Sequence, residues 1–533
     1  MIHDLARATL AWAATARVLV LVSVPTLRVL TFGAAFLLAS CSMSLAQTQI
    51  QGTNLLEAQA GNVPFLNPPN RTSLYDALDL DVRTSWGRIG GRFETDRSSD
   101  NTLAYATFTR RFVEWNDNHL RARVGTVYTL LGRGMIHRSF ELPGVILNEQ
   151  STLSRYGPSR DVDGALVEVS LGPWSTRLLA GTANTGLSSP GTGSVRYAGE
   201  LAGGQTSLDF HGSGTVGAAY LRSTSTGAQQ QELGSGFAGI DPLDAFAIHA
   251  VSLPLYFEYA QLGRKASQWT SFSTATRDTH ALYASANLIW NTVSFSAEWK
   301  DYQHFRLGTN DPPSLVREQS VQLLNRGTHV LNADDERGFQ LEGAWAAPLG
   351  LTATANLTRA DTKRSITPKR FEERFFELRV RPTRATIEGA LFYDRGRDEF
   401  VGLRARRVMG GSATWRVTPR WSTSLDVQQQ RAMRGKTTFV DRYLSAEAAR
   451  AEWGSVAMIW EHTNDPLEED PAKFGGAVDP RDFVATTVHA RVSEKHEAAL
   501  FYGERRGGLA CTAGTCYQVL AFKGAELRLT TRF

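Results

Sequence analysis

Val293-Ser-Phe-Ser-Ala-Glu-Trp-Lys300 is the stretch that decides the fold, because its side chains alternate strictly between apolar and polar. Successive side chains of a β-strand point to opposite faces. The apolar residues from Val293 to Trp299 would therefore share one face, and the polar residues from Ser294 to Lys300 the other. The same alternation predicts an all-β chain, since it recurs at 339–345, 351–358, 421–428 and 484–492.

Two architectures produce such alternation. In a soluble sandwich or propeller the apolar face is a shared core and the polar face meets water. In an outer-membrane barrel the apolar face meets lipid and the polar face lines an aqueous lumen. The connections favour the barrel, because short turns alternate with long polar loops. Short turns include 172–173, 291–292, 347–350, 382–383 and 418–420, and long loops run near 224–241, 264–278, 304–336 and 463–482.

Tryptophan placement also favours the barrel. A soluble core would hold tryptophan at strand centres, whereas a membrane interface gathers it at strand ends. Many of the tryptophans of this chain lie close to a predicted short turn. These are Trp86, Trp115, Trp174, Trp290, Trp345, Trp421 and Trp453.

The last residues alternate in the same way. Phe533, Thr531 and Leu529 share one face, opposite Arg532 and Thr530. This ending resembles the carboxy-terminal signal of bacterial outer-membrane barrels, which the barrel assembly machinery reads. The resemblance implies that Phe533 is an assembly signal and that this machinery is a partner.

A second resemblance concerns the end of the chain and one earlier segment. Gly507-Gly-Leu-Ala-Cys-Thr-Ala-Gly-Thr-Cys-Tyr517 resembles the final hairpin of an uncharacterised family of large exported outer-membrane barrels. Leu130-Leu-Gly-Arg-Gly-Met135, followed by Arg138 and Glu141, is similar to the same family. The resemblance implies a large single-chain, porin-like barrel and carries over no activity.

The strand pattern predicts a transmembrane antiparallel up-and-down barrel of about 24 strands, within a range of roughly 18–26, and bacterial single-chain barrels have even numbers. If the short turns lie on the periplasmic rim, the long loops are extracellular. Strands are expected near 48–59, 73–84, 87–97, 102–114, 119–130, 163–171, 174–183, 198–210, 214–223, 242–252, 255–263, 279–289, 292–303, 337–347, 351–360, 372–381, 384–395, 401–416, 421–431, 438–452, 455–462, 483–493, 497–506 and 517–533.

Residues 1–46 are predicted to be a signal peptide. They carry three arginines against one acid, an apolar run at 29–38 and a small-residue ending at Ser44-Leu-Ala46. Processing as a lipoprotein at Cys41 is the alternative. The expected organisation is a signal peptide at 1–46, an N-terminal segment with the first strand at 47–72, and the outer-membrane barrel at 73–533.

Composition and motifs argue against several functions. Lys+Arg 57 against Asp+Glu 53 gives a net charge of +4, too balanced for a nucleic-acid binder of this size. Three cysteines are too few for a thiolate metal cluster. His496-Glu497 has no second histidine after it, and no Gly-x-Ser-x-Gly elbow occurs. No enzymatic activity, cofactor or metal site is expected, and too few residues precede Ser73 for a conventional plug domain.

The polar strand faces are expected to line the lumen. Rings of charged side chains set local fields and order water in channels. The expected pore-lining residues are Asp79, Asp81, Arg83, Arg121, Arg123, Glu298, Glu342, Glu377, Arg379, Arg404, Arg406, His489 and Arg491.

The longest early insertion, 131–162, mixes charged and apolar residues. Such a loop should not extend freely into water. It is expected either to fold into the lumen as a constriction or to pack against neighbouring loops without selectivity. A constriction would be formed by Arg133, His137, Arg138 and Glu141.

Two further features concern the surface loops. Cys511 and Cys516 are expected to form a disulfide on an exposed hairpin crown, because export is oxidising and the nearby glycines let the loop bend. The acidic stretch 465–470 is interpreted either as a solvated loop or as a bridge to lipopolysaccharide through divalent cations.

The sequence is best explained by a passive channel for small hydrophilic solutes in the bacterial outer membrane. A barrel this wide without a plug leaves an aqueous lumen. One alternative is a structural or assembly component that docks surface protein partners through its long loops. Another is a hatch-gated transporter of apolar compounds, which the charged inward faces count against. Outer-membrane lipid and lipopolysaccharide are the expected surroundings, and no nucleic acid is expected to bind.

Overall fold

The structure is a computed structural model of the 533-residue chain. The predicted signal peptide and the alternative processing site at Cys41 lie outside the described residues. The chain divides into two units, Ile50–Val82 with Trp86–Phe533, and Met1–Gln49 with Arg83–Ser85. The structure describes residues 48–63, 70–99, 104–149, 154–184, 189–192, 197–210, 213–224, 231–246, 250–263, 279–362, 367–382, 386–466, 480–512 and 514–533.

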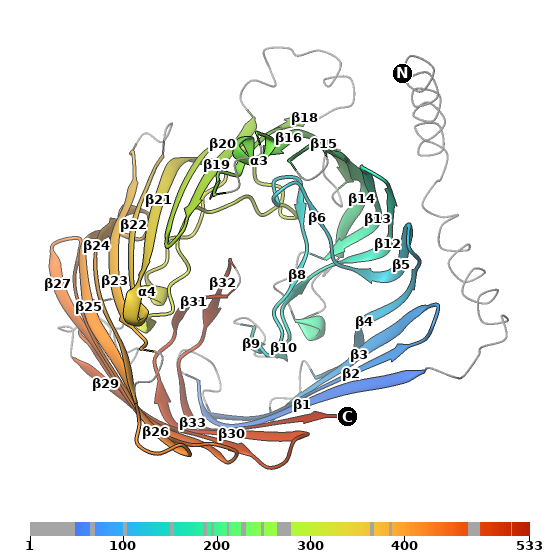
Figure 1. Ribbon diagram of the computed structural model, residues 1–533. Helices are drawn as coiled ribbons and strands as arrows, with labels where there is room; N and C mark the ends of the chain where they lie inside the picture. Colours follow the sequence, from blue (N-terminus) through green and yellow to red (C-terminus); the bar gives the residue numbers. More distant parts are fainter. Residues whose placement is uncertain are drawn as a thin grey trace, which may run out of the picture. The chain divides into compact units, whose positions relative to one another are not determined.

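The larger unit is a closed antiparallel β-barrel. Its first strand, β1 (Gln49–Asn62), pairs with its last, β33 (Phe522–Arg532), with Leu56 opposite Leu529. This pairing closes the ring in Figure 1, where β1 and β33 run side by side. Within the described part of the chain the wall has twenty-four strands, together with the two-residue β17, so the predicted barrel and its strand number are confirmed.

The remaining wall strands are β2 (Asn70–Arg83), β3 (Gly87–Ser98), β4 (Tyr105–Asn116), β5 (Leu120–Val127), β12 (Val162–Leu171), β13 (Trp174–Asn184), β14 (Tyr197–Asp209), β15 (Gly214–Thr224), β16 (Gln231–Ile240), β17 (Val251–Ser252), β18 (Leu255–Gly263), β19 (His280–Trp290), β20 (Val293–Gln303), β21 (Asp335–Ala347), β22 (Leu351–Asp361), β23 (Arg370–Val380), β24 (Ile387–Asp398), β25 (Leu403–Arg416), β26 (Trp421–Arg434), β27 (Thr437–Arg450), β28 (Gly454–Thr463), β29 (Arg481–Arg491) and β30 (His496–Arg505). Short elements lie between them: β6 (Leu130–Leu131), β7 (His137–Arg138), β8 (Phe140–Glu141), β9 (Leu147–Asn148), β10 (Arg155–Tyr156), β11 (Ser159–Arg160), η2 (Pro190–Thr192), α3 (Pro242–Ala245), α4 (Gln322–Arg326), η5 (Pro348–Gly350), η6 (Glu399–Val401), β31 (Gly508–Thr512) and β32 (Thr515–Val519).

One predicted strand is wrong. The segment 242–252 contains α3 and β17, and the wall strand is β16, which we expected to be loop. The three glycines of β16 weaken its alternation, which is why the pattern was missed. Asp241 instead caps the start of the helix α3, because its side chain accepts hydrogen bonds from the backbone N–H groups of Leu243 (3.1 Å) and Asp244 (3.3 Å). Pro242 follows as the first helical residue, a position that suits proline.

The outward face of the barrel is apolar. Along β24, for example, Ile387, Leu391 and Tyr393 point outward and are exposed, while the alternate residues Phe392 and Asp394 are buried inside. A closed sheet satisfies every backbone hydrogen bond internally, which is why such an exposed apolar surface suits lipid. Among the described residues, no helix combines the length and apolarity needed to span a membrane.

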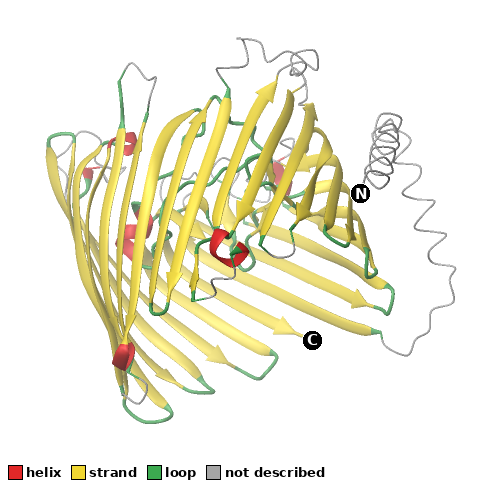
Figure 2. Cartoon of the chain, turned by 45° about the horizontal axis from the view of Figure 1, so that its top comes forward, coloured by secondary structure: helices red, strands yellow, loops and turns green. Residues whose placement is uncertain are grey.

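Tryptophan marks one rim of the barrel. The short turns lie along the lower rim in Figure 2, and exposed tryptophans occur at or near the strand ends of that rim. Indole rings favour the boundary between lipid and water, so this row marks one edge of the membrane-spanning band. Its exposed members are Trp115, Trp174, Trp290, Trp345, Trp415, Trp421 and Trp453.

Candidate functional site: the narrowed lumen

The inward face of the first strands is charged, and the charges pair across neighbouring strands. Asp79 on β2 accepts hydrogen bonds from Arg92 of β3 (2.8 Å) and Arg110 of β4 (2.7 Å). One step nearer the short turns, Asp81 forms an ion pair with Arg88. These two predicted lining residues therefore lie inside the barrel as parts of a ladder of ion pairs.

The ladder continues around the wall. Arg121 on β5 donates to Glu114 of β4 (2.8 Å) and to Glu168 of β12 (2.8 Å). Arg123 lies 3.4 Å from the same Glu114, and its guanidinium is 3.7 Å from the centre of the Phe112 ring. Arg123 is buried and Arg121 remains partly exposed, so these two predicted lining residues share a wall but differ in their contact with water.

Predicted lining residues on the opposite wall also point inward. Glu298 on β20 accepts a hydrogen bond from the hydroxyl of Tyr283 (2.7 Å). Glu342 on β21 accepts one from Arg317 (2.6 Å), which belongs to the connection between β20 and β21. Glu377 on β23 lies 3.3 Å from Arg379 on the same strand.

Arg406 has the most enclosed position of the predicted set. Its guanidinium is buried on the inner face of β25, where it donates to Glu373 (2.6 Å) and Asp394 (3.1 Å) of the two preceding strands. It also donates to the carbonyl oxygen of Gly327 (2.9 Å), which belongs to a segment inside the lumen. Arg406 therefore connects the wall to a chain segment inside the lumen, a contact that the alternation alone did not predict.

The other predicted lining residues lie near strand ends. Arg404 is exposed at a β-bulge near the start of β25, so it does not share the buried position of Arg406. Arg83 is the last residue of β2 and is exposed. His489 and Arg491 lie on β29, where both line a hollow on the short-turn side of the lumen.

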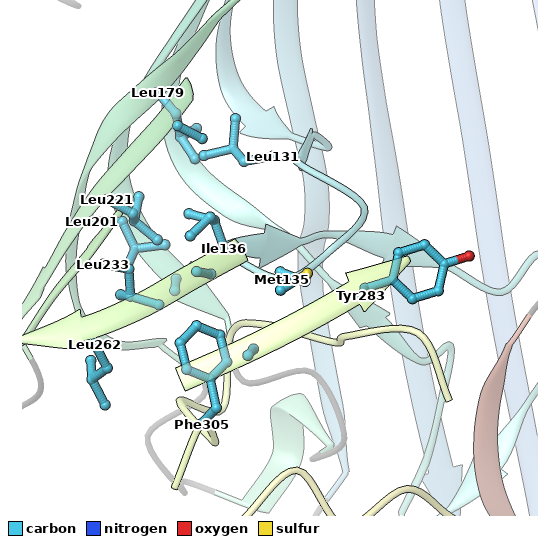
Figure 3. Close-up of a cluster of buried hydrophobic side chains, with 14 of the residues drawn as sticks. Leu131, Met135, Ile136, Leu179, Leu201, Leu221, Leu233, Leu262, Tyr283 and Phe305 are labelled. Atoms are coloured by element: carbon cyan, nitrogen blue, oxygen red, sulfur yellow. The ribbon is translucent and has the colours of Figure 1, made fainter. Parts of the chain in front are cut away.

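The described parts of the connection 128–161 between β5 and β12, residues 128–149 and 154–161, fold into the lumen. Its segments β6, β8, β9 and β10 lie inside the ring of strands in Figure 1. One end packs on an apolar patch of the inner wall (Figure 3), which buries Leu131, Met135 and Ile136 completely. Removing this apolar area from water holds the connection to that wall. The wall patch includes Leu179, Leu201, Leu221, Leu233, Leu262 and Tyr283.

The far end of the same connection reaches the seam where the barrel closes. Arg155 forms a buried ion pair with Glu57 of β1, and Glu57 also pairs with Arg528 of β33 (2.5 Å). The backbone N–H of Arg155 donates to Asp96 (3.0 Å) and its carbonyl accepts from the Tyr105 hydroxyl (2.6 Å). Burial lowers the pKa of the Arg155 guanidinium to about 10. The connection 128–161 therefore crosses the lumen, with apolar contacts at one end and ionic contacts at the other.

The four predicted constriction residues lie along this crossing segment, but they do not converge. Arg133 covers the ring of Tyr256 at 4.1 Å, and Arg138 donates to Asp311 (2.6 Å). Glu141 pairs with Arg92 and Arg110 of the wall, the two arginines that also pair with Asp79 in the ladder. Each of these three residues therefore takes part in a different contact.

His137, the remaining member of that set, is completely buried. Its Nε2 lies 2.7 Å from the hydroxyl oxygen of Ser139. Burial, with a smaller contribution from Arg160, lowers the pKa of His137 to about 4, so the ring is neutral at pH 7. A neutral buried histidine holds the segment in place and presents no charge to a solute.

The connection 304–334, between β20 and β21, is the second segment inside the lumen. Its helix α4 packs Leu323 and Leu324 against buried Phe375, Phe392 and Val408 of the wall. The backbone N–H of Leu323 donates to Gln428 (3.0 Å). Because Phe375 and Gln428 belong to β23 and β26, the segment leaves its own strands and is fixed to the wall two to five strands further along the ring.

Two buried ionic contacts also fix this second segment. Arg326 at the end of α4 pairs with Glu461 of β28. His329 lies between Asp398 (3.1 Å) and Glu336 (3.2 Å), and Glu336 pairs with buried Lys300 (2.5 Å). Burial lowers the pKa of His329, but the hydrogen bonds to Asp398 and Glu336 outweigh it and raise the pKa above the ordinary 6.5.

The hairpin of β31 and β32 is the third segment inside the ring (Figure 1). Cys511 and Cys516 face each other in it and form a disulfide. The backbone N–H of Cys511 donates to Asn325 of α4 (2.9 Å). We expected this hairpin to be an exposed crown, but Cys511 is buried, because the hairpin turns inward and packs beside α4.

These lumenal contacts include residues that the sequence did not single out. Glu57 and Arg528 alternate correctly for an inward position on their strands, so the polar face itself was a usable signal. Arg155 and Arg326 gave no such signal, because they lie in connections and their partners Glu57 and Glu461 lie on strands distant from them in the chain. Asp465 of the predicted acidic loop is likewise buried and accepts from Arg434 (3.1 Å), while Glu468–Asp470 lie outside the described residues.

Hollows lie between these segments and the short-turn rim. One, of about 500 Å³, faces β28, β29, β30 and β33. Another, also of about 500 Å³, faces β23, β24, β25 and β26. The second is mainly polar and charged, whereas the first combines charged residues with an apolar side formed by Ala498, Leu500 and Phe501. The first is lined by His489, Arg491, Glu497, Arg505, Glu526 and Arg528, and the second by Arg381, Thr386, Glu388, Thr414, Arg416 and Ser422.

The closed wall, its apolar exterior and its charged interior define a large transmembrane β-barrel of the bacterial outer membrane, narrowed by its own chain.

No protein-family model matches the chain, and no curated protein matches it. Similar solved structures include Pseudomonas aeruginosa OccK5 (OpdH), 13% identical over 74% of this chain and 100% of that one, with a TM-score of 0.40. The translocation pore of the P pilus usher PapC is 8% identical over 91% and 99%, with a TM-score of 0.42. The siderophore receptor PirA of P. aeruginosa is 9% identical over 91% and 80%, with a TM-score of 0.40.

Proposed function

We propose that the barrel is a channel for the passive passage of small hydrophilic solutes, narrowed by the three segments 128–161, 304–334 and 506–521. The observation that supports it is the charged lining of the two hollows on the short-turn side, together with the ion-pair ladder of the wall. Charged side chains that line a pore order water and act on charged and polar solutes, so such a lining suits hydrophilic solutes.

The apolar patch of the lumen does not support transport of apolar compounds. Its leucines are covered by Leu131, Met135 and Ile136 and are themselves buried. It therefore offers no open apolar surface among the described residues. The alternative of docking surface partners concerns the long loops, and it stays a prediction.

The lining also favours anions. The hollow beside β23–β26 brings Arg381 and Arg416 together with one acid, Glu388, and the adjoining pocket adds Arg379. With Glu377, which pairs with Arg379, three arginines stand against two glutamates and leave a net charge of +1 in that part of the lumen. Charged side chains that line a pore select ions of opposite sign.

Conductance of the purified barrel in planar bilayers tests the proposal. Wild-type protein should form stable channels, and replacing 508–519 with a short glycine-serine turn should raise the single-channel conductance. The double variant Arg381→Glu, Arg416→Glu should shift the reversal potential toward cations. Arg337→Gln is the matched control, since Arg337 lies over Trp299 on the outward face. A folded barrel that conducts in neither the wild-type nor the shortened form would contradict the proposal.

A further inference from the structure

Four arginines lie directly opposite one another on four neighbouring strands. Strand pairing places Arg374 of β23 opposite Arg395 of β24, Arg395 opposite Arg407 of β25, and Arg407 opposite Arg431 of β26. All four are exposed. We call them the arginine row. The residues next to them in sequence are buried inside the barrel, so the row lies on the outward face. These buried neighbours include Phe375, Asp394, Arg406 and Gln430.

The row is electrostatically unfavourable as it stands, because like charges placed directly opposite on neighbouring strands repel. Arg374 donates to Glu372 (2.6 Å). Among the described residues, Arg395, Arg407 and Arg431 have neither a hydrogen bond nor an ion pair. An outward arginine elsewhere on the barrel differs in this respect, since Arg111 pairs with Asp163 at 2.9 Å. The row therefore lacks its counter-charge within the described protein.

A fifth arginine extends the same surface. Arg442 on β27 is exposed and lies opposite Gln429 of β26, one outward position nearer the short turns than Arg431. It also has no hydrogen-bond or ion-pair partner in the described part of the chain. The positive surface thus covers five adjacent strands.

The height of the row along the wall indicates what meets it. On β25 the outward residues after Arg407 are Met409, Gly411, Ala413 and Trp415, the last belonging to the tryptophan rim. The eight residue-to-residue steps from Arg407 to Trp415 span about 27 Å of strand. A strand tilt of roughly 40° reduces this to about 20 Å of height, close to the roughly 25 Å apolar band of such barrels. The row therefore lies at the other edge of the band, on the long-loop side, which is extracellular in bacterial barrels.

We propose that the arginine row binds the phosphate groups of lipopolysaccharide in the outer leaflet. Guanidinium groups form bidentate, charge-assisted hydrogen bonds with phosphate oxygens. The phosphates of lipid A lie at the boundary between acyl chains and water, which is the height of the row. The acyl chains would then cover the apolar wall below Arg407 and Arg431. The binding partner supplies the counter-charge that the described protein lacks.

Binding of lipid A to the full-length barrel tests this assignment. Wild type and the triple variant R395Q/R407Q/R431Q are placed in phosphatidylcholine nanodiscs and titrated with fluorescent bis-phosphorylated lipid A. Each surface arginine contributes about fivefold to the binding of anionic lipid, so the triple variant should bind on the order of 100-fold more weakly. The triple lysine variant should retain most of the binding, because it keeps the charge. Arg111→Gln, in which the substituted arginine is already paired, should bind as wild type does.

Stability without lipid A separates binding from a folding defect. In neutral detergent the triple glutamine variant should unfold at a temperature no lower than wild type, since it removes like-charge contacts. A lower unfolding temperature would show that the row is paired within the barrel and would overturn the proposal. So would unchanged lipid A binding by the triple variant, equal binding by wild type of lipid A stripped of both phosphates, or full displacement by millimolar inorganic phosphate.

Discussion

Individual residues inside the lumen show that the partners of a buried side chain, and not its burial alone, set its chemistry. His137 and His329 both lie in lumenal segments, yet the pKa of one is lowered and that of the other is raised. His137 has only a hydroxyl and a nearby arginine around it, whereas His329 lies between two carboxylates. The two histidines therefore respond to pH in opposite directions.

His137 predicts that mild acid weakens the connection 128–161. Its pKa is about 4 in the folded protein and about 6.5 when unfolded, so the unfolded state binds more protons between these values. Stability contributed by neutral His137 is complete above pH 6.5 and falls as pH drops through this window. The loss at pH 5 should be about 2 kcal/mol. Hydrogen exchange of residues 128–149 should therefore be faster at pH 5 than at pH 7, after correction for intrinsic rates.

The control for this prediction is His137→Gln, whose side chain stays neutral over the same range. That variant should lose most of the additional exchange at pH 5. An equal pH dependence in wild type and variant would assign the effect to another group.

The disulfide leads to a second prediction at the residue scale. Cys511→Ser should leave membrane insertion normal, because the wall strands β30 and β33 pair with each other independently of the hairpin. Closing so short a loop should stabilise the hairpin by about 2 kcal/mol or less. The variant hairpin should be cut faster by protease than that of wild type. Failure of Cys511→Ser to insert would show that the bridge serves assembly instead.

At the scale of elements, the three lumenal segments are held by contacts to strands distant from their own. The helix α4 is too short to be stable by itself, so packing and ion pairs to the wall must hold it. Arg326 and Glu461 supply the main ionic contact, and both side chains are largely buried. Elements of this kind therefore depend on their contacts with the closed wall.

Removing one partner of that contact should loosen α4. Arg326→Met leaves the Glu461 carboxylate without its partner in a buried position, which costs about 3 kcal/mol. Glu461→Gln should have a smaller effect, because the amide can still accept a hydrogen bond. Channel current noise in planar bilayers should rise in Arg326→Met and fall back toward wild type in the double variant Arg326→Met, Glu461→Leu. Additive effects of the two changes would show that the pair is not coupled.

At the scale of the whole molecule, the pairing of β1 with β33 closes the barrel. Phe533 and Gly52 exchange backbone hydrogen bonds of 2.8 and 3.0 Å, and the ring of Phe533 occupies the space above Gly52. A Cβ at position 52 would clash with the Phe533 ring, so that ring would have to move to accommodate any other residue there. An assembly signal at Phe533 stays a prediction, but its packing gives that residue a place in the closed barrel.

Phe533→Asp should therefore impair closure, since it puts a charge on the outward face beside Gly52 and removes the ring contact. The variant should show less heat-modifiable migration on gels and less recovery in the outer-membrane fraction. Phe533→Leu, which keeps an apolar side chain, should resemble wild type. Gly52→Val should also impair closure. Normal heat-modifiable migration of both Phe533→Asp and Gly52→Val would show that the contact between Phe533 and Gly52 is not needed for closure.

The sequence by itself determined the wall of this protein. Alternation such as that of 293–300 is a local property that reports directly which side chains face each side of a strand, so the barrel and its strand number followed from it. Tryptophan near the short turns located one membrane boundary, because its place beside a turn is also a local property of the sequence. The exception was β16, whose glycines gave no alternation to detect.

Only the tertiary structure decided what occupies the lumen and what faces the outer leaflet. The pairing of Arg155 with Glu57 and of Arg326 with Glu461 joins segments from different parts of the ring, and no local pattern encodes such partners. The arginine row likewise exists only because strand register aligns four separate arginines. Period-two patterns determine a face, whereas register and the folding of long connections depend on the free energy of the whole closed barrel.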